Sequence, residues 1–334
     1  MTTPYVIGIG NAVMDVIAPT TDESLARLAV EKGIMQLIDR ERSEFLMAAQ
    51  SADLDTGKAR LVPGGSVANT LAGIGMLGLR TAFIGRVADD ALGLSYAEQT
   101  EAGGTVFVNP PVSGDVLPTS RSIIMVTPDG ERSMNTYLGI SADLGPDDVN
   151  PSVFGGAGWL FLEGYLFDKP GGKAAFLKAA DCCRAAGGQA GIALSDPFCV
   201  DRHREDFRRL IAGPMDYVIG NIHEWESLYQ CGLEDALAEA VRDCGLVVCT
   251  RSGEPPLLIR GDQRVSVPVN RVVPVDATGA GDQFAAGLIY GLAIGAGLEV
   301  AGRMGCLAAA EVISHVGARP ERDLRAEFRA QGLN

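Results

Sequence analysis

The residues best suited to chemistry lie in one short segment, Asp276–Phe284, which reads DATGAGDQF. A β-rich run at 265–275 precedes this segment, and a helix is predicted from about 281 to 294. The glycines at 279 and 281 allow successive backbone N–H groups to point at one place without interference from a Cβ atom. At the amino terminus of a helix, such a loop predicts an anion site suited to a phosphoryl group in transfer.

Asp282 lies in the first turn of this predicted helix and is the candidate general base. A helix amino terminus lowers the pKa of a carboxyl group, so we expect a weak base in the ground state. Phosphoryl transfer tolerates a weak base because the attacking hydroxyl loses its proton late in a loose transition state. The plain alternative is that Asp282 only caps a helix after a glycine-containing turn.

Four motifs, in this order along the chain, resemble those of the ribokinase-like or PfkB carbohydrate kinases. They are PGGSVANTLAGIGMLG at 63–78, GRVADDALG at 85–93, NIHE at 221–224 and DATGAGDQF at 276–284. The resemblance spans residues 8 to about 317, almost the whole chain. It implies an ATP- and Mg²⁺-dependent kinase that phosphorylates a hydroxyl group of a sugar or a nucleoside. Ala88 and Gln283 depart from the family pattern, but neither change removes a group that the chemistry needs.

The resemblance also implies roles on the nucleotide side of the site. Asp282 would be the catalytic base, with the backbone amides of Gly279, Ala280 and Gly281 as the anion hole. Glu224 would organise Mg²⁺ and phosphate through water, although by itself it reads as a solvated helix carboxylate. The implied nucleotide-binding residues are Asn221, Thr250, Gly253, Gly279, Gly281, Val316 and Gly317. Family members often use a monovalent cation beside the anion hole, which makes K⁺ a candidate cofactor here.

On the acceptor side, the resemblance implies a sugar site around Asp15, whose carboxylate accepts hydrogen bonds from two adjacent hydroxyls. Glycines at this site allow the backbone to approach the sugar closely, and Asn69 adds a donor and an acceptor. The implied acceptor-site residues are Asn11, Asp15, Gly64, Gly65 and Asn69. The plain alternatives are a turn residue after a strand for Asp15 and an ordinary helix cap for Asn69.

The string GGSVANTLA is closer to the adenosine-kinase-like branch than to the polar GGKGANQA of the sugar kinases. The spacing of Asn11 and Asp15 and the pair Arg132–Ser133 also resemble that branch. Six side chains could form an apolar wall against the nucleobase of a nucleoside. Alternatively, they could pack between the main sheet and a small β-sheet that acts as a lid. They are Ile34, Met35, Leu37, Tyr137, Leu138 and Tyr165. A nucleoside is therefore the first expectation, and a simple sugar such as ribose or fructose is the alternative.

The sequence argues against two other classes of protein and leaves a third open. A dinucleotide-binding oxidoreductase needs a third glycine at position 13, which is Val13. A P-loop kinase needs GxxxxGK[ST], which does not occur. A non-catalytic nucleotide- or sugar-binding protein on the same fold stays open, because a fold does not guarantee a function.

Apolar strands that alternate with longer helical stretches predict an α/β fold with parallel strands. With the resemblance, we expect one ribokinase-like domain over 1–334, a three-layer α/β/α sandwich with a small β-sheet lid. The lid would come discontinuously from about 12–40 and 104–140, with strands at 33–38, 104–109 and 120–127. The main-sheet strands are expected at 6–9, 82–85, 159–162, 190–194, 217–220 and 246–250. Helices are expected at 66–77, 172–186, 233–244, 281–294 and 298–315.

The overall composition limits partners and location. The net charge is −14, with a pI near 4.7, which argues against nucleic acid or an anionic membrane as partner. The seven cysteines include no CxxC pair, so we expect no disulfide framework and no zinc site. A cytoplasmic protein is expected, because the start of the chain reads as a buried strand and not as a signal peptide. In this family exposed lid sheets often pair between subunits, so a homodimer through the lid is expected.

Overall fold

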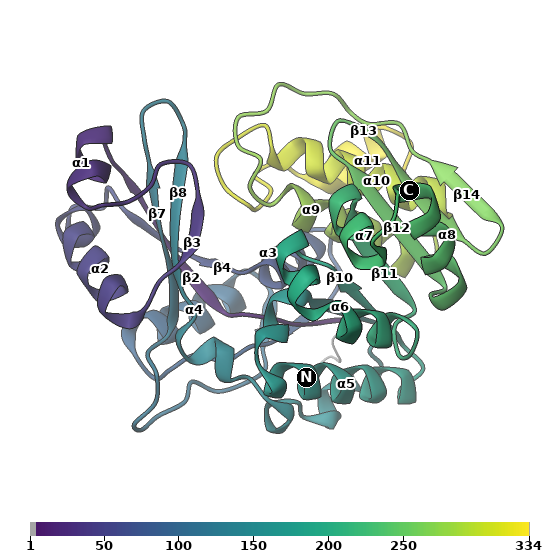
Figure 1. The fold of residues 1–334 in the computed structure, drawn as a ribbon, viewed down its shortest axis with the longest axis horizontal. Helices are drawn as coiled ribbons and strands as arrows, with labels where there is room; N and C mark the ends of the chain where they lie inside the picture. Colours follow the sequence, from purple (N-terminus) through teal and green to yellow (C-terminus); the bar gives the residue numbers. More distant parts are fainter. Residues whose placement is uncertain (1–4, 334) are drawn as a thin grey trace.

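The structure, a computed structural model, describes residues 5–333 and contains two β-sheets of different size (Figure 1). In the larger sheet the strands run in the order β14-β13-β12-β11-β10-β9-β1-β5-β6. Neighbouring strands from β12 to β6 are parallel, and β13 and β14 add an antiparallel edge. The strands are β1 (Val6–Ile9), β5 (Thr81–Ile84), β6 (Thr105–Phe107), β9 (Trp159–Glu163), β10 (Gln189–Ala193), β11 (Tyr217–Asn221), β12 (Leu246–Arg251), β13 (Glu254–Arg260) and β14 (Gln263–Ser266).

Helices cover both faces of the larger sheet, because its strands send apolar side chains alternately to either side. In β1, Val6 packs with the helices of one face, whereas Ile7 and Ile9 pack with those of the other. The first face carries α3 (Ser66–Met76), α4 (Ala91–Ala102), α9 (Ala280–Ala293) and α10 (Leu298–Val312), with α11 (Leu324–Ala330) packed outside α10. The second carries α5 (Pro170–Ala185), α6 (Pro197–Ile211), α7 (Ile222–Tyr229) and α8 (Leu233–Asp243). The predicted α/β/α sandwich is therefore confirmed.

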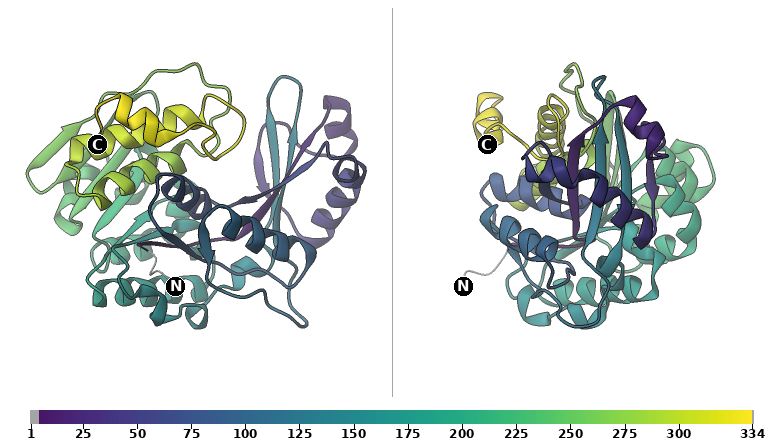
Figure 2. Two further views of the ribbon diagram at one scale, coloured as in Figure 1. Left: turned by 180° about the vertical axis from the view of Figure 1, so that it is seen from behind. Right: turned by 90° about the vertical axis from the view of Figure 1, so that its left-hand side faces the viewer.

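The smaller sheet has the strand order β3-β8-β7-β2-β4 and stands beside the sandwich (Figure 2). Its strands are β2 (Val13–Pro19), β3 (Met35–Leu37), β4 (Arg60–Gly64), β7 (Ser120–Val126) and β8 (Arg132–Tyr137). Helices α1 (Asp22–Arg27) and α2 (Arg40–Asp55) cover its outer face. Residues 10–12 carry the chain directly from β1 of the larger sheet into β2 of the smaller one. Four short 3₁₀ helices complete the structure, at Gly139–Asp143, Pro146–Asp148, Pro151–Phe154 and Gly164–Asp168.

Two sequence predictions about strands are wrong. Residues 104–109 were expected in the smaller sheet, but β6 pairs with β5 at the edge of the larger one. The buried Phe107 ring lies 6.0 Å from that of Phe83 and 5.7 Å from that of Tyr96, and this aromatic cluster explains the placement. The place in the smaller sheet is taken by β4, antiparallel to β2, which the sequence did not predict. The second wrong prediction is the β-rich run at 265–275. The strand β14 ends at Ser266, and Val273 and Val275 are exposed.

Two further properties of the described residues concern membranes and thiols. No helix in residues 5–333 is long and apolar enough to cross a membrane. All seven cysteines are free. Burial raises the pKa of the Cys183, Cys199, Cys249 and Cys306 thiols to about 12, so these four stay protonated and unreactive.

The packing of α9 on α10 yields a stability prediction. A Cβ atom at Gly287 would lie 2.4 Å from the Met304 carbonyl oxygen. Gly→Ala in a helix interior normally stabilises by about 1 kcal/mol, but overpacking against backbone costs about 1–3 kcal/mol. We therefore expect Gly287→Ala to lower the free energy of unfolding, measured by urea denaturation. Gly155→Ala, where the added methyl meets only an ordinary contact at 3.7 Å, is the control. A stabilised Gly287→Ala would contradict this packing.

Candidate active site

The sequence-predicted residues gather at the carboxyl edge of the parallel strands, which is where open α/β sheets bind ligands. There β1 ends before Asn11, β9 ends at Glu163, and Asn221 of β11 lies in register with Thr250 of β12. The amino termini of α3 and α9 reach the same place, because Ser66 of α3 contacts Asp282 of α9. The site thus lies where the two sheets meet.

The loop before α9 has the unpaired donors that an anion site needs. Gly279 caps the helix in the left-handed conformation, with φ of 78°. A Cβ atom there would lie 2.6 Å from the Ala318 Cα, so only glycine fits. Among residues 5–333, the amides of Gly279, Gly281 and Asp282 find no hydrogen-bond partner, whereas the Ala280 amide donates to the Ala277 carbonyl at 3.3 Å. The amides of Gly279, Gly281 and Asp282 are therefore free to bind an anion. The Ala280 amide, which belonged to the predicted anion hole, is not free.

The Asp282 carboxylate is held by two side chains of α3. Ser66 Oγ donates to Oδ1 at 2.7 Å, and Asn69 Nδ2 donates to Oδ2 at 3.1 Å. Burial raises the pKa of Asp282 above its usual value, and these two hydrogen bonds oppose the rise. The expected net lowering of this pKa is therefore wrong, and burial is the largest cause of the rise. The carboxylate accepts no amide hydrogen bond from α9, so Asp282 does not act as a helix cap.

The alternative predictions for Asp15, a turn residue, and for Asn69, a helix cap, are both wrong. Asp15 lies within β2 and not in a turn, and the cap of α3 is Gly65 and not Asn69. Burial raises the pKa of Asp15 to about 7; Arg132 and Arg319 oppose this rise, and Asp282 adds to it.

The two predicted glycines do allow close backbone approach, although the groups approached are protein atoms. A Cβ atom at Gly64 would lie 2.4 Å from Asp15 Oδ2. At Gly65, with φ of 99°, it would lie 2.2 Å from the Asn11 carbonyl oxygen. The turn from β4 into α3 is therefore packed directly against Asp15 and Asn11.

Asn11 has its side chain occupied within the protein. Its Nδ2 donates to Glu163 Oε1 at 3.1 Å, and its Oδ1 accepts from Ser141 Oγ at 2.9 Å. Glu163, fully buried at the end of β9, also accepts from the Asn11 amide at 2.7 Å and the Val67 amide at 3.3 Å. Burial raises the pKa of Glu163 to about 7. Sequence reasoning missed Glu163, for which the only signal was an acid ending the apolar run WLFLE.

The nucleotide-side candidates surround a capping box at the start of α7. Both Glu224 oxygens accept from Asn221, from its amide and from its Nδ2, each at 2.7 Å, and the Glu224 amide donates back at 3.0 Å. Glu224 is buried, which raises its pKa to about 7, so the solvated reading is wrong. Gly253 and Val316 lie on exposed turns, and the Gly317 amide donates to Asp276 Oδ2 at 2.9 Å.

These residues fit a hydrated Mg²⁺ better than a directly coordinated one. Among residues 5–333, no group of three or more His, Cys, Asp or Glu side chains is placed to hold a metal ion. Glu224 and Asn221 already use part of their hydrogen-bonding capacity on each other. Mg²⁺ keeps several waters in such sites and takes much of its coordination from substrate phosphates, so contact through water suits this pair.

An ion pair joins the smaller sheet to the loop before α9. The guanidinium of Arg132, in β8, pairs with the carboxylate of Asp276, and both side chains are less than 10% exposed. Asp276 also accepts from Thr278 Oγ1 at 2.6 Å and from the Gly317 amide. Burial alone would raise the pKa of Asp276, but these donors and Arg132 hold it below its usual value. The first residue of the DATGAGD motif thus links the smaller sheet, the loop before α9 and the carboxy-terminal loop.

Strand register decides which predicted wall residues face Asp15. The cross-strand partners of Asp15 lie in one row across the sheet, Ser122, Thr136 and Leu37, and the next row reads Ile17, Ile124, Met134 and Met35. Cross-strand partners share a face, so Leu37 and Met35 lie on the face of Asp15. Tyr137 lies on the opposite face, with its ring 5.5 Å from the Arg121 guanidinium, so its place in the wall was wrong. Tyr165 donates to the Ser195 carbonyl instead.

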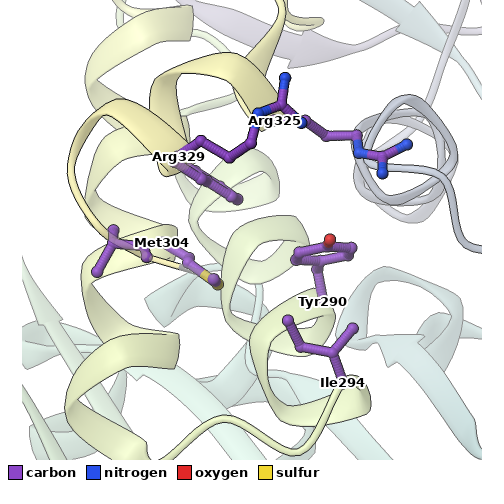
Figure 3. A pocket seen from close by; sticks show the side chains of 7 residues that line it. Tyr290, Ile294, Met304, Arg325 and Arg329 are labelled. Carbon is purple, nitrogen blue, oxygen red and sulfur yellow. The ribbon is translucent and has the colours of Figure 1, made fainter.

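Two surface hollows lie away from these residues. Figure 3 shows the first, between α9, α10 and α11, with Tyr290, Met304 and Arg325 on its walls. Its volume of about 160 Å³ is below the roughly 300–1,000 Å³ of ligand pockets. The second is lined by Trp159, Gln189, Asp216, Leu246 and Arg260, at the amino-terminal edge of the parallel strands. Neither contains a predicted site residue.

Comparison with known proteins agrees with this geometry. The sequence profile of the pfkB family carbohydrate kinases matches residues 31–324. The chain belongs to this family. Kinases of the family transfer a phosphoryl group from ATP, generally with Mg²⁺, to a hydroxyl of a sugar or a nucleoside.

Solved structures and curated relatives extend the match. A probable sugar kinase from Rhizobium etli CFN 42 is 41% identical with a TM-score of 0.89, over 100% of both chains. Adenosine kinase from Sinorhizobium meliloti is 40% identical with a TM-score of 0.88, over 99% of this chain and 100% of that one. A fructokinase from Klebsiella pneumoniae is 28% identical over 256 residues, 72% of this chain and 80% of its own length. The pfkB fold is therefore shared over the full chain, and the relatives include both sugar and nucleoside kinases.

The contact between Ser66 and Asp282 gives a pH prediction. Ser66→Ala removes a donor that lowers the pKa of Asp282, so this pKa should rise and the carboxylate should form only at higher pH. The measurement is a ¹³C NMR titration of labelled aspartates, with Asp282→Asn used to assign the signal. Ser51→Ala, at an exposed position of α2, is the control. An unchanged or lower pKa of Asp282 would show that Ser66 does not stabilise its ionised form.

Proposed function

We propose that this chain transfers the γ-phosphoryl group of ATP to a hydroxyl of a nucleoside of the adenosine type. The observation that carries the proposal is the Asp282 carboxylate, held by Ser66 and Asn69 beside unpaired amides at the start of α9. A simple sugar of the ribose or fructose type is the second candidate, favoured by the similarity to a fructokinase.

Asp282 is proposed as the base and Asp15 as the anchor for the acceptor. Asp15 accepts hydrogen bonds from two acceptor hydroxyls, and Asp282 takes the proton of the attacking hydroxyl. The attacking oxygen then bonds to the γ-phosphorus while the bond to the bridging oxygen breaks and ADP leaves. The raised pKa of Asp282 supports this role, because a base works best when its pKa approaches the working pH. The free amides of Gly279 and Gly281 stabilise the charge on the transferred group.

ATP is proposed to lie along Asn221, Thr250, Gly253, Val316 and Gly317. Asn221 and Glu224 would hold Mg²⁺ through water, and the ion would neutralise phosphate charge. K⁺ has less support, because Asp276 beside the anion loop already pairs with Arg132 and offers little uncompensated charge.

The smaller sheet is proposed as a lid of the single domain over 1–334, which excludes water so that ATP is not hydrolysed. The ion pair of Arg132 with Asp276 supports it, because it brings the inner face of that sheet to the anion loop. A homodimer through β3 is proposed with it, supported by the position of β3 at the edge of the smaller sheet.

A nucleoside is preferred over a simple sugar because of the apolar row beside Asp15. Met35 and Leu37 are 50% and 56% exposed, and with Met134 they share the Asp15 face of the sheet. Exposed apolar side chains around one carboxylate suit a ring system that also bears hydroxyls.

A coupled ADP-release assay tests the proposal directly. The panel contains nucleosides, pentoses and hexoses, with Mg²⁺ and with or without K⁺. Selective turnover of a nucleoside would support the first candidate, and selective turnover of a sugar would support the second. Bound ATP without turnover of any acceptor would favour a non-catalytic binding protein on the same fold.

Asp282→Asn tests the base. Loss of general-base catalysis should lower kcat by about 10²–10⁴-fold, while the dissociation constants of ATP and acceptor change little. Turnover is measured in single-turnover mode and affinity by calorimetry. Asp243→Asn, at the exposed end of α8, is the matched control. Full turnover of Asp282→Asn would rule out this base.

Met134→Ala tests the apolar row. Burying less apolar surface against a base should raise KM for a nucleoside by about tenfold, with little change for a simple sugar. Phe45→Ala, at an exposed position of α2 on the outer side of the sheet, is the control. Equal changes in KM for nucleosides and simple sugars would show that Met134 packs within the protein and does not contact a nucleobase.

A further inference from the structure

Arg319 lies two residues after Gly317, a proposed nucleotide-binding residue, yet its side chain contacts residues on the acceptor side of the site. Its Nη2 donates to the Pro63 carbonyl oxygen, and its Nε donates to Asn69 Oδ1 at 3.4 Å. Pro63 precedes Gly64, the glycine whose backbone packs on the Asp15 carboxylate. One guanidinium from the carboxy-terminal loop therefore contacts both β4 and α3.

Several anchors fix the loop that carries Arg319. The Ala318 carbonyl accepts from Gln283 Nε2 at 3.0 Å, and the same fully buried amide donates to the Asn69 carbonyl at 2.9 Å. After Arg319, the buried Glu311 carboxylate accepts the amides of Glu321 and Arg322, both at 3.0 Å. A loop held on both sides of Arg319 presents its guanidinium in a defined place, which favours a positioning role over a solvated surface charge.

The contact with Arg319 determines which way the Asn69 amide points. A guanidinium only donates and a carboxylate only accepts, so Asn69 must turn Oδ1 to Arg319 and Nδ2 to Asp282. Without Arg319, only Asp282 would orient this amide.

Arg319 also favours the ionised form of Asp15, the proposed anchor of the acceptor. Arg132 from β8, Arg319 from the loop and Asp282 from α9 act electrostatically on Asp15. The contact of Arg319 with Pro63, next to Gly64, places its guanidinium on the Asp15 side of the site. Both arginines favour ionised Asp15, whereas Asp282 opposes it. Since Arg132 also pairs with Asp276, Arg319 is the arginine of the two without a carboxylate hydrogen-bonded to it in residues 5–333.

We propose that Arg319 is a positioning residue that sets both carboxylates of the transfer reaction, Asp282 through the Asn69 amide and Asp15 through its charge. This inference rests on the proposed function, because it concerns the same acceptor site. It assigns the carboxy-terminal loop a part in acceptor binding besides its proposed contact with the nucleotide.

The first test needs no substrate. Asp15 and Asp282 are titrated by ¹³C NMR in the native chain and in Arg319→Gln, Arg319→Lys and the control Arg322→Gln, an exposed arginine. In Arg319→Gln both pKa values should rise, because Asp15 loses a cation and the Asn69 donor to Asp282 is oriented from one side only. Arg319→Lys should restore Asp15, since its charge remains, and Arg322→Gln should change neither. Unchanged titration of both aspartates in a folded Arg319→Gln would overturn the proposal.

The second test uses an acceptor that the native chain phosphorylates. Loss of the charge-assisted contacts should raise the acceptor KM at least about tenfold, leave the KM for ATP within about twofold, and move the acid limb of kcat/KM to higher pH. A change confined to the KM for ATP, or an unmoved acid limb, would overturn the inference. If the native chain phosphorylates no acceptor, the proposed function fails, and the NMR titration alone still decides the role of Arg319.

Discussion

Three carboxylates, Asp15, Glu163 and Asp282, lie at the junction of the two sheets, where burial raises the pKa of each. Asp282 raises the pKa of both other groups. Buried charges are tolerated only when donors or opposite charges surround them. The amino-terminal half of α3 supplies most of these donors, from the Val67 amide to Glu163 and from Ser66 and Asn69 to Asp282. The two arginines, Arg132 and Arg319, supply the positive charge.

This constraint explains why α3 is placed so tightly. A Cβ atom at Gly8 would lie 2.3 Å from Val67 Cγ1, and one at Gly73 would lie 2.1 Å from Gln283 Oε1. The glycines allow α3 to lie against β1 on one side and against α9 on the other. Small shifts of α3 would separate Ser66 and Asn69 from Asp282 together. The geometry of the proposed base is therefore a property of helix packing and not of the GAGD loop alone.

The acidic surface does not conflict with a polyanionic substrate. The net charge is −14, but electrostatic attraction near the site is local. Unpaired amides at the start of α9, together with Arg319, place positive potential at the candidate site. A net negative charge elsewhere does not weaken these short-range contacts, because salt screens distant charges.

The family, the sandwich, its main strands and helices, and the segment that carries Asp282 were all predictable from the sequence. These follow from local information: the period of apolar residues, the glycines at 279 and 281, and motifs within single loops. Tyr137 and the strand at 104–109 were misplaced, because the face of a strand and its sheet depend on register and on partners far along the chain.

The contacts of Glu163, Ser66 and Arg319 became visible only in the folded chain. Each contacts a residue at least 95 positions away, as with Glu163 and Val67 or Ser66 and Asp282. The direction of the Asp282 pKa shift likewise depends on burial, which no local pattern reveals and which here exceeds the effect of the Ser66 and Asn69 hydrogen bonds. Chemistry that depends on a short motif can be read from sequence, whereas desolvation and long-range donors exist only once the chain has packed.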